Sequence, residues 1–497
     1  MDSQGNLYLV GSSSSLPFVT NYTHQAVHQG NGDGFIVKIN AAGATIWGTY
    51  FGGTGYDVIL AIAVDTNDNL YVLGTTSSTT GIADANAYQP LNAGGSDAFV
   101  AKFTAAGTKL WSTYYGGTEN DGGGSYNFFE EGVSPVGIAV DAVGNAYIHT
   151  MMQSPGMASV GAFQQNPLQE DQYIAIIAGF SSTGTRLWST YYGINGSQMG
   201  GITANATGLY VAGCTRDCPP SHTNNTYFST TGSHQTQPGS CRDAFLTKFD
   251  FNGQRVWSTY FGGTSPENIR TNHLKSYGSF VYLSGTTFSG SGIATPGAFQ
   301  ETRSLSDNIF LAKFDENGNR LWGTYCGTNS AQNEGSYSNT SIDSQGNVYL
   351  CGTTDFSENI ATSGAYQPQK ASIRDSFAIK FNPEGEKIWG TYYGGSKDDR
   401  SAQILVHEDS FYLVGITGSP DNISTPNGMQ PTADFSDPIV KHAYIARFDP
   451  TPLAVENQQN VPVSIYPNPA KDNFSISLPG NPNLLRLQMY NALGQLV

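Results

Sequence analysis

Aspartates recur just after glycine pairs in this sequence, and carboxylates placed in loops are the groups that could hold calcium. They are Asp57, Asp121, Asp398 and Asp399. Calcium needs about six to eight oxygen ligands, and no Asp-x-Asp-x-Asp spacing supplies them here. We therefore expect these carboxylates to hydrogen-bond tight turns and the protein to need no cofactor, with calcium binding as the alternative.

Histidines and cysteines could bind zinc or form a disulfide. His24 and His28 have the spacing of helical zinc ligands, but they lie in a loop without a Cys or Glu-x-x-His companion, so we expect solvated side chains. Cys218 and Cys241 flank much of one long loop. An oxidising exterior favours a disulfide between them, with Cys214 as the competing partner.

Catalytic motifs are missing from the sequence. We find no Gly-x-Ser-x-Gly elbow, no His-Glu-x-x-His and no glycine-rich phosphate loop before a helix. A carboxylate pair assembled from separate elements is the one catalytic arrangement that the sequence leaves open. We expect a protein that is not an enzyme, with a glycan-processing hydrolase or lyase as the alternative.

Aromatic side chains in the longest loops are the candidate ligand contacts. They are Tyr126, Phe128, Phe129, Tyr227 and Phe228. Such side chains among glycines stack on sugars or hold a partner protein, and simple packing on the rim of the fold is the alternative interpretation.

The elements that position these residues follow from an internal repeat of four strands, a to d. Strand a is apolar and ends in Asp (61–65), strand b alternates and ends in Gly (70–74), strand c begins with Asp (97–103), and strand d carries a Trp (110–115). Every Trp of the chain occupies this place in strand d: Trp47, Trp111, Trp188, Trp257, Trp322 and Trp389. The strand-b tyrosine occurs in seven copies: Tyr8, Tyr71, Tyr147, Tyr210, Tyr282, Tyr349 and Tyr412.

Seven hairpin-linked copies of four strands predict an all-β, seven-bladed β-propeller. A Trp at one identical position per blade favours packing between blades over ligand stacking. A lysine also recurs in strand c, and in four repeats it follows the Asp that begins the strand, which we interpret as structural charge pairing. The lysines are Lys38, Lys102, Lys248, Lys313 and Lys380.

Loop lengths indicate where a ligand binds. The a–b and c–d turns are short and uniform, whereas the b–c and d–a connections are long and variable and lie on the same rim of a propeller. Insertions confined to one face mark the binding face. We expect this rim to hold an unknown protein or glycan.

Charge and hydropathy exclude two classes of partner. The formal net charge of −16 argues against nucleic acid, whose binding requires a basic face. No apolar run is long enough to span a membrane.

Both ends of the repeat region are incomplete. Residues 2–6 repeat letter for letter as 343–347, the turn between strands a and b, and residues 443–448 form a seventh strand c with no strand d after it. We expect the first and last blades to be incomplete. We also expect the natural protein to continue upstream with a Trp-Thr-Tyr-like strand that completes the last blade, preceded by a signal peptide.

Two resemblances to known families fit this organisation. The Tyr-Pro-Asn-Pro element at 466–469 and the pattern at 490–497 resemble the C-terminal sorting domain of the bacterial type IX secretion system. This implies export to the outer surface or exterior of a gram-negative cell, with the type IX machinery as a partner. The sequence divides into a propeller (1–450), a linker (451–460) and part of a small β-sandwich sorting domain (461–497).

The propeller region resembles the bacterial SBBP repeat family. The resemblance lies in the recurring elements Gly52-Gly53, 62–65, 71–76 and 97–102. It implies the fold and an extracellular setting, and it implies no shared enzymatic activity.

Overall fold

The computed structural model divides into two compact units, Met1–Leu453 and Ala454–Val497. The structure describes residues 1–16, 21, 23–122, 136–168, 173–194, 196–215, 226–269, 273–304, 308–326, 338–355, 359–426, 428, 430–433, 435, 441–449, 464–466 and 475–477. These residues form strands and turns, and none of them belongs to a helix that could cross a membrane.

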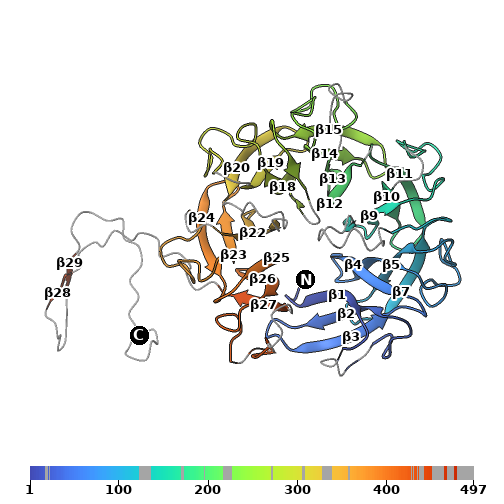
Figure 1. The fold of residues 1–497 in the computed structure, drawn as a ribbon, viewed down its shortest axis with the longest axis horizontal. Coiled ribbons are helices and arrows are strands. Elements are labelled where there is room, and N and C mark those ends of the chain that lie inside the picture. Colours follow the sequence, from blue (N-terminus) through green and yellow to red (C-terminus); the bar gives the residue numbers. More distant parts are fainter. Residues whose placement is uncertain are drawn as a thin grey trace. The chain divides into compact units, whose positions relative to one another are not determined.

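Seven antiparallel sheets follow one another along the first unit and stand in a ring (Figure 1). The second, third, fourth and sixth blades have four strands each, ordered from the centre outward as strands a to d. These strands are β4 (Asp57–Val64), β5 (Leu70–Thr76), β6 (Asp97–Phe103) and β7 (Lys109–Tyr115); β8 (Gly137–Val140), β9 (Ala146–Met152), β10 (Ile174–Phe180) and β11 (Arg186–Tyr191); β12 (Gln198–Asn205), β13 (Gly208–Cys214), β14 (Ala244–Phe249) and β15 (Arg255–Phe261); and β21 (Ser338–Ile342), β22 (Val348–Thr354), β23 (Asp375–Phe381) and β24 (Lys387–Tyr393).

The remaining three blades depart from this pattern. In blade 5 two short strands, β16 and β17, share the inner position and both pair with β18. The prediction of a seven-bladed propeller is confirmed, and among the described residues blade 1 has no strand a and blade 7 has no strand d. The strands are β1 (Leu7–Ser13), β2 (Asp33–Ile39) and β3 (Thr45–Phe51); β16 (Glu267–Asn268), β17 (Leu274–Tyr277), β18 (Phe280–Thr287), β19 (Asn308–Phe314) and β20 (Arg320–Cys326); and β25 (Asp399–His407), β26 (Ser410–Thr417) and β27 (His442–Phe448).

The a–b turns are built by the Asp that ends strand a. The Asp65 carboxylate accepts hydrogen bonds from the backbone N–H groups of Asn67 and Asn69 and from the Asn69 side chain, at 2.9 to 3.2 Å. The hydroxyl of Tyr71, the strand-b tyrosine, lies 3.3 Å from the same carboxylate. An Asx-type turn of this kind satisfies backbone donors that the strands leave free, which explains why this Asp and this Tyr recur together.

The glycine that ends strand b accommodates an aromatic side chain from strand c. A Cβ at Gly74 would lie 2.3 Å from the ring of Phe99, which is opposite it in the sheet. Gly213 and Phe245 repeat this arrangement at 2.6 Å. The pairing of Gly in strand b with Phe in strand c is therefore a packing rule of the blade.

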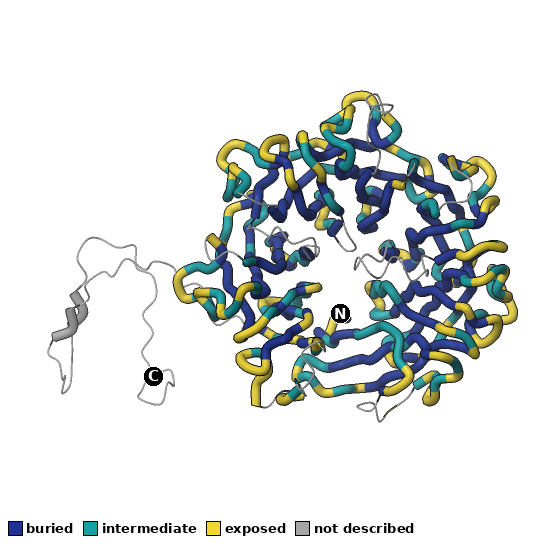
Figure 2. Tube along the Cα trace, viewed as in Figure 1, coloured by how far each residue is buried: buried dark blue, intermediate teal, exposed yellow. Residues whose placement is uncertain are grey.

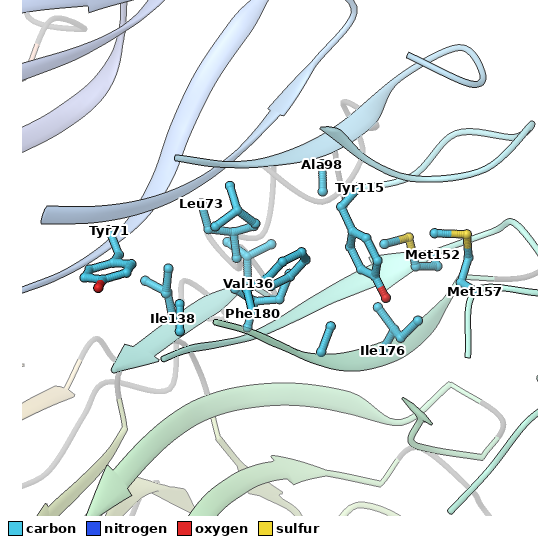
Figure 3. Close-up of a cluster of buried hydrophobic side chains, with 14 of the residues drawn as sticks. Tyr71, Leu73, Ala98, Tyr115, Val136, Ile138, Met152, Met157, Ile176 and Phe180 are labelled. Atoms are coloured by element: carbon cyan, nitrogen blue, oxygen red, sulfur yellow. The ribbon is translucent and has the colours of Figure 1, made fainter. Parts of the chain in front are cut away.

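The strands of the ring are mostly buried, whereas its connections are mostly exposed (Figure 2). The hydrophobic core is divided into clusters between neighbouring blades. Figure 3 shows one cluster, in which Tyr71 and Leu73 of blade 2 meet Ile138, Ile176 and Phe180 of blade 3. Because a single blade exposes two apolar faces, each face is buried only when the next blade stands against it.

The indole rings lie between blades, as the repeat predicts. Trp257 is 8% exposed, and a Cβ at Gly318, in the c–d turn of the next blade, would lie 3.0 Å from it. Gly318 has a φ of +84°, so a side chain is disfavoured there on both conformational and steric grounds. The equivalent pairs are Gly107 with Trp47, Gly184 with Trp111, Gly253 with Trp188 and Gly385 with Trp322.

A hydrogen-bonded contact, which we call the turn latch, accompanies each of these indoles. The Trp257 Nε1–H donates to the carbonyl oxygen of Glu316 in the next c–d turn at 2.8 Å, and Lys248 Nζ donates to the same oxygen at 3.3 Å. The same carbonyl is shared by Trp and Lys at three further junctions, where the acceptors are Ala105, Ser182 and Pro383. Blade 3 has Gly179 at the lysine position, and there Trp188 alone donates, to Phe251.

The lysines are structural, but their carboxylate partner differs from the predicted one. Lys38 lies 2.9 Å from Asp2, and Lys380 lies 3.1 Å from Asp343. Both aspartates belong to a–b turns and not to the start of strand c. The lysine therefore ties the a–b turn of its own blade to the c–d turn of the next.

The ring closes through contacts between blade 7 and blade 1. Arg447, at the lysine position of β27, donates from Nη1 to the carbonyl oxygen of Ala41 at 3.1 Å. Ala41 lies in the c–d turn of blade 1, so this is the lysine half of a turn latch. A Cβ at Gly5 of blade 1 would also lie 2.6 Å from the His407 ring of blade 7.

The second unit contributes one described hairpin. Strands β28 (Ser464–Tyr466) and β29 (Ser475–Ser477) pair antiparallel. They fall in the region that resembles the sorting domain.

Candidate functional site

The b–c and d–a connections meet on one face of the propeller. Each d–a turn that begins with a glycine pair, which we call a corner, contacts the b–c connection of the next blade. Gly55 N donates to Ser78 Oγ at 2.8 Å, Ser265 N to Ser289 Oγ at 3.0 Å, and Lys397 N to Ser419 Oγ at 2.8 Å. Because these contacts recur around the ring, both sets of connections share a single rim.

Most of the predicted calcium ligands are corner residues whose oxygens accept hydrogen bonds. The Asp57 carboxylate accepts from Gly53 N at 2.8 Å, from Ser78 Oγ at 2.9 Å and from Thr76 Oγ1. Asp57 is fully buried. These bonds fix the corner, which is the turn-stabilising role that the sequence favoured.

Asp121 and Asp399 repeat this arrangement in other blades. Asp121 accepts from the backbone N–H groups of Gly117, Gln153 and Ser154 at 2.6 to 3.0 Å. Asp399 accepts from Gly395 N at 2.7 Å and Ser419 Oγ at 2.8 Å.

Asp398 differs from the other three because it is partly exposed. Its carboxylate lies 2.6 Å from Arg374 Nη2 and 3.9 Å from Arg400. Among the described residues no group of three or more His, Cys, Asp or Glu side chains could hold a metal ion.

A second carboxylate, which the sequence analysis missed, lies beside each corner Asp. A Cβ at Gly52 would lie 2.6 Å from both the Asp33 and the Asp57 carboxyl groups. Asp33 begins strand c of one blade and Asp57 begins strand a of the next, so the pair forms only when the blades assemble. The other pairs are Asp97 with Asp121, Asp243 with Glu267, and Asp375 with Asp399.

Burial sets the protonation of these pairs. Desolvation, with a smaller contribution from the neighbouring carboxylate, raises the pKa of Glu267 to about 8 and that of Asp97 to about 6. Burial also raises the pKa of Asp243 to about 6. Two close carboxylates in a desolvated site cannot both ionise readily, so such a pair retains a proton.

The b–c connections have a structural part as well as an exposed part. In each of the six blades with a described strand d, a segment that we call the strap runs along the outer edge of that strand. In blade 2 Asp84 N donates to Ser112 O, and Tyr114 N to Gln89 O, both at 3.1 Å. The strap covers a sheet edge that would otherwise be open to other chains.

A glutamine at the end of the strap connects it to the corner. Gln89 Nε2 donates to Asp97 at 2.9 Å, and Gly116 N donates to Gln89 Oε1 at 3.0 Å. Gln25, Gln235 and Gln367 do the same in their blades. The sequence signal for this role is the recurrence of Ala87-Tyr88-Gln89 as Ala298-Phe299-Gln300 and Ala365-Tyr366-Gln367.

The aromatic residue before this glutamine packs between two blades. Arg186 of blade 3 lies over the ring of Tyr88 of blade 2 at 4.7 Å, and Arg255 of blade 4 lies over Phe163 of blade 3 at 4.4 Å. His24 occupies the equivalent place in blade 1, where it packs against Phe51 and Phe103.

His234 fills the same place in blade 4. It lies between Phe261 and Phe314, and burial together with the charge of Arg320 lowers its pKa to about 4. Both strap histidines pack against aromatic rings of two blades and remain exposed to solvent on their other side. His222 lies outside the described residues.

The predicted aromatic contacts separate into two groups. Phe228 is fully buried and stacks on Phe245 with a centroid distance of 3.9 Å, and Tyr227 packs 5.5 Å from Tyr192. These two rings belong to the core between blades 3 and 4. The other three predicted contacts, Tyr126, Phe128 and Phe129, lie outside the described residues.

The cysteines give a partial answer. Cys214 and Cys241 form no disulfide with each other, and Cys214 is buried in β13. Cys218 lies outside the described residues, and a Cys218–Cys241 disulfide stays a prediction.

The fold and the rim define the class: a seven-bladed β-propeller whose long connections gather on one face. Residues 46–80 match the SBBP beta-propeller repeat, and residues 464–497 match the secretion system C-terminal sorting domain. The chain is thus a seven-bladed propeller with a match to the SBBP repeat at residues 46–80 and a match to a secretion sorting domain at residues 464–497. This domain indicates export to the cell surface or the extracellular space and implies contact with the secretion machinery.

Other comparisons add no functional argument. No curated protein matches the chain. A protein of unknown function from Bacteroides caccae is 10% identical (76% of this chain and 96% of that one covered, TM-score 0.32). The phage phi92 endosialidase is 12% identical (99% and 78%, TM-score 0.36), and a protein of unknown function from Dyadobacter fermentans is 9% identical (74% and 94%, TM-score 0.35). At these TM-scores none of them bears on what this chain does.

Proposed function

We propose that this protein is an exported binding scaffold without enzymatic activity, whose rim of b–c and d–a connections holds a protein or a glycan. The observation that carries the proposal is a contrast between the two faces of the ring. The a–b and c–d turns are uniform, and they make the structural contacts between neighbouring blades that form the turn latches. The connections on the rim differ in length and sequence from blade to blade. Variable loops on a rigid repeat scaffold are the usual place for recognition.

Exposed apolar side chains on the rim support a binding role. Tyr56 in a corner and Phe288 at the start of a b–c connection are both 42% exposed. Leu91 and Ile373, on other b–c connections, are 68% and 77% exposed. Aromatic side chains of this kind provide stacking surfaces for sugar rings and anchors for protein partners.

The state of the carboxylate pairs supports a role without catalysis. Glycosidases work with two carboxyl groups that flank a substrate in an open site. The corner pairs of the described blades are buried, and their oxygens accept hydrogen bonds from the corner and the strap. A sugar ring cannot reach them without opening a blade junction.

A glycan array and a pull-down with the full chain test the binding role. Replacing Tyr56 and Phe288 by Ser should weaken the binding of any captured ligand about ten-fold or more, because exposed aromatics at the centre of an interface contribute strongly. The matched control is Val143→Ser, since Val143 is 74% exposed but lies in an a–b turn on the opposite face. Equal loss in the control would show that the ligand does not bind on the rim.

We also expect the C-terminal unit to direct export, to the outer surface or the medium of a gram-negative host. Removing residues 454–497 should leave the protein inside the cell, because the sorting domain lies in this segment. Fractionation of cells and medium with an antibody against the propeller measures this. Export of the truncated chain at the level of the full chain would contradict the proposed role of the tail.

A further inference from the structure

Tyr56 is held in the corner between blades 1 and 2, but its side chain has no structural partner there. Its backbone N–H donates to Ser77 Oγ at 2.8 Å, and its carbonyl oxygen accepts from Ser77 N at 2.9 Å. With the described residues its ring and hydroxyl form no hydrogen bond, aromatic contact or cation contact. Tyrosines elsewhere in the ring use their side chains, as when the Tyr114 hydroxyl donates to Ser78 O at 2.9 Å. A tyrosine that the fold fixes but does not use is available to a ligand.

One side of the Tyr56 ring lies against the backbone of blade 1. A Cβ at Gly32 would be 3.6 Å from both Cδ2 and Cε2 of the ring. Gly32 has a φ of +125°, so a side chain that would push the ring away is disfavoured at this position. The tyrosine is 42% exposed. The ring is therefore a preorganised flat surface, and binding to it costs little side-chain entropy.

The exposure of this corner position does not depend on the blade beside it. The equivalent residues Asn120 and Pro266 are exposed as well, and the blades on both sides of Asn120 have all four strands. In the corner between blades 6 and 7 the equivalent residue is Asp398, which pairs with Arg374 at 2.6 Å. Of these four corners, only the one between blades 1 and 2 presents an aromatic ring at this position.

The connections around Tyr56 carry almost no charge. The b–c connections on its two sides, residues 14–32 and 77–96, contain no Lys, Arg or Glu. Asp84 is their one acidic residue, and it pairs with Lys109 at 2.8 Å. A charged ligand would lose hydration at Tyr56 without gaining a counterion, so the surroundings favour an uncharged one.

Polar groups suited to sugar hydroxyls lie beside the ring. Ser12 Oγ is 3.3 Å from the Cβ position at Gly32, the point that the ring also approaches. Asn31 N donates to Gly55 O at 3.0 Å, which holds the exposed Asn31 beside the residue that precedes Tyr56. An amide and a hydroxyl both donate and accept, so they can replace water on sugar hydroxyls, while an aromatic ring covers the C–H face of a pyranose.

We propose that Tyr56, Asn31 and Ser12 form a binding site for an uncharged glycan at the junction of blades 1 and 2. The proposal rests on the proposed function of the rim and specifies the class of its ligand. A pyranose lies on the exposed side of the Tyr56 ring, and its hydroxyl groups bind the Asn31 amide and the Ser12 hydroxyl. Protein partners are usually anchored by several aromatic or arginine side chains, whereas one ring flanked by an amide and a hydroxyl matches one sugar residue.

Native affinity electrophoresis of the full-length chain tests this assignment. The gels contain a soluble α-glucan, β-glucan, mannan or xylan, and alginate and heparin serve as charged probes. We expect at least one uncharged polysaccharide to retard the protein and the charged ones to leave it unretarded. Tyr56→Ala should weaken the binding about ten-fold or more, and Tyr56→Phe about three-fold or less, because phenylalanine keeps the ring and lacks only the hydroxyl.

Tyr277→Ala is the matched control. Tyr277 is 38% exposed and also lies against a glycine, since a Cβ at Gly346 would be 2.9 Å from its ring. It stands at the end of β17, next to an a–b turn on the opposite face, so this variant should bind like the wild type. Thermal unfolding of the three variants checks that each of them folds.

The proposal is overturned by retardation in the charged polysaccharides alone, by no retardation in any uncharged one, or by binding that Tyr56→Ala leaves unchanged. A protein captured in the pull-down and lost in Tyr56→Ala would also overturn it, while leaving the rim as a binding face. Equal loss of binding in Tyr277→Ala would instead contradict the rim itself, so the failure of the glycan site and the failure of the proposed function give different results.

Discussion

Replacing Trp257 by Ala should lower the free energy of unfolding by about 4 kcal/mol, in the range measured for large aromatic residues in cores. Its indole fills the junction between blades 4 and 5, where it packs on the turn at Gly318 and lies 6.1 Å from Tyr210. The substitution leaves a cavity and removes the hydrogen bond to the Glu316 carbonyl. Denaturation by urea, followed by circular dichroism, measures the loss.

Two further substitutions separate packing from hydrogen bonding at this junction. Trp257→Phe keeps an aromatic ring but leaves the Glu316 carbonyl without its indole donor, and should cost about 1–2 kcal/mol. Val256→Ala, at the neighbouring residue that is 54% exposed, should change stability by less than about 0.5 kcal/mol. If Trp257→Ala is no more destabilising than Val256→Ala, the indole does not hold the two blades together.

The ring of blades was predictable because the residues that recur in each repeat are the ones that pack between blades. One Trp register located strand d in six blades and one Tyr register located strand b in all seven, and periodic elements that cannot bury both faces alone must stack. The incomplete first and last blades followed from the same register.

The partner of the lysines was not predictable from local sequence. Asp97 and Lys102 are close in the chain, but five residues of strand separate their Cα atoms by about 16 Å. The carboxylate that Lys102 approaches is Asp65, at 3.7 Å, because the start of strand b lies opposite the end of strand c. Strand pairing, and not sequence distance, decides which charges meet.

Contacts between segments that are distant in the sequence also explain why the carboxylate pairs and the straps on the rim were not predicted. The corner carboxylates pair across a blade junction, so neither sequence neighbourhood contains both members. The b–c connections were predicted as binding loops, yet their strap halves cover strand d, and their aromatic and histidine side chains pack between blades. Only the parts of the b–c connections outside the straps remain for recognition, and among the predicted contacts Tyr227 and Phe228 lie in the core.

Replacing Glu267 by Gln should remove much of the loss of stability of this protein at alkaline pH. Burial, together with the nearby Asp243, raises the pKa of Glu267 to about 8, above the value of about 4.5 expected in the unfolded chain. Between these values the folded state holds a proton that the unfolded state has lost. Stability is therefore complete below about pH 4.5 and falls as the pH rises through 8, by on the order of 4 kcal/mol.

Other corner carboxylates act on stability in the same direction as Glu267, whereas the carboxylates of the a–b turns act in the opposite one. The raised pKa values of Asp97 and Asp243, both about 6, reduce stability as the pH rises from about 4 to 6. At Asp2 burial alone would raise the pKa, but hydrogen bonds from Lys38 and Asn6 outweigh it and hold the pKa well below the usual range. Its stabilising effect is lost when acid protonates it, so the protein should be most stable in mildly acidic solution.

Midpoints of urea denaturation at pH 5, 7 and 8.5 test this assignment. The wild type should lose stability from pH 5 to 8.5, and Glu267→Gln should lose clearly less, because a glutamine keeps an acceptor for Thr287 Oγ1 and does not ionise. Glu384→Gln, at an exposed residue of a c–d turn, is the matched control and should follow the wild type. A Glu267→Gln variant with the full pH dependence of the wild type would show that a group other than Glu267 holds the proton.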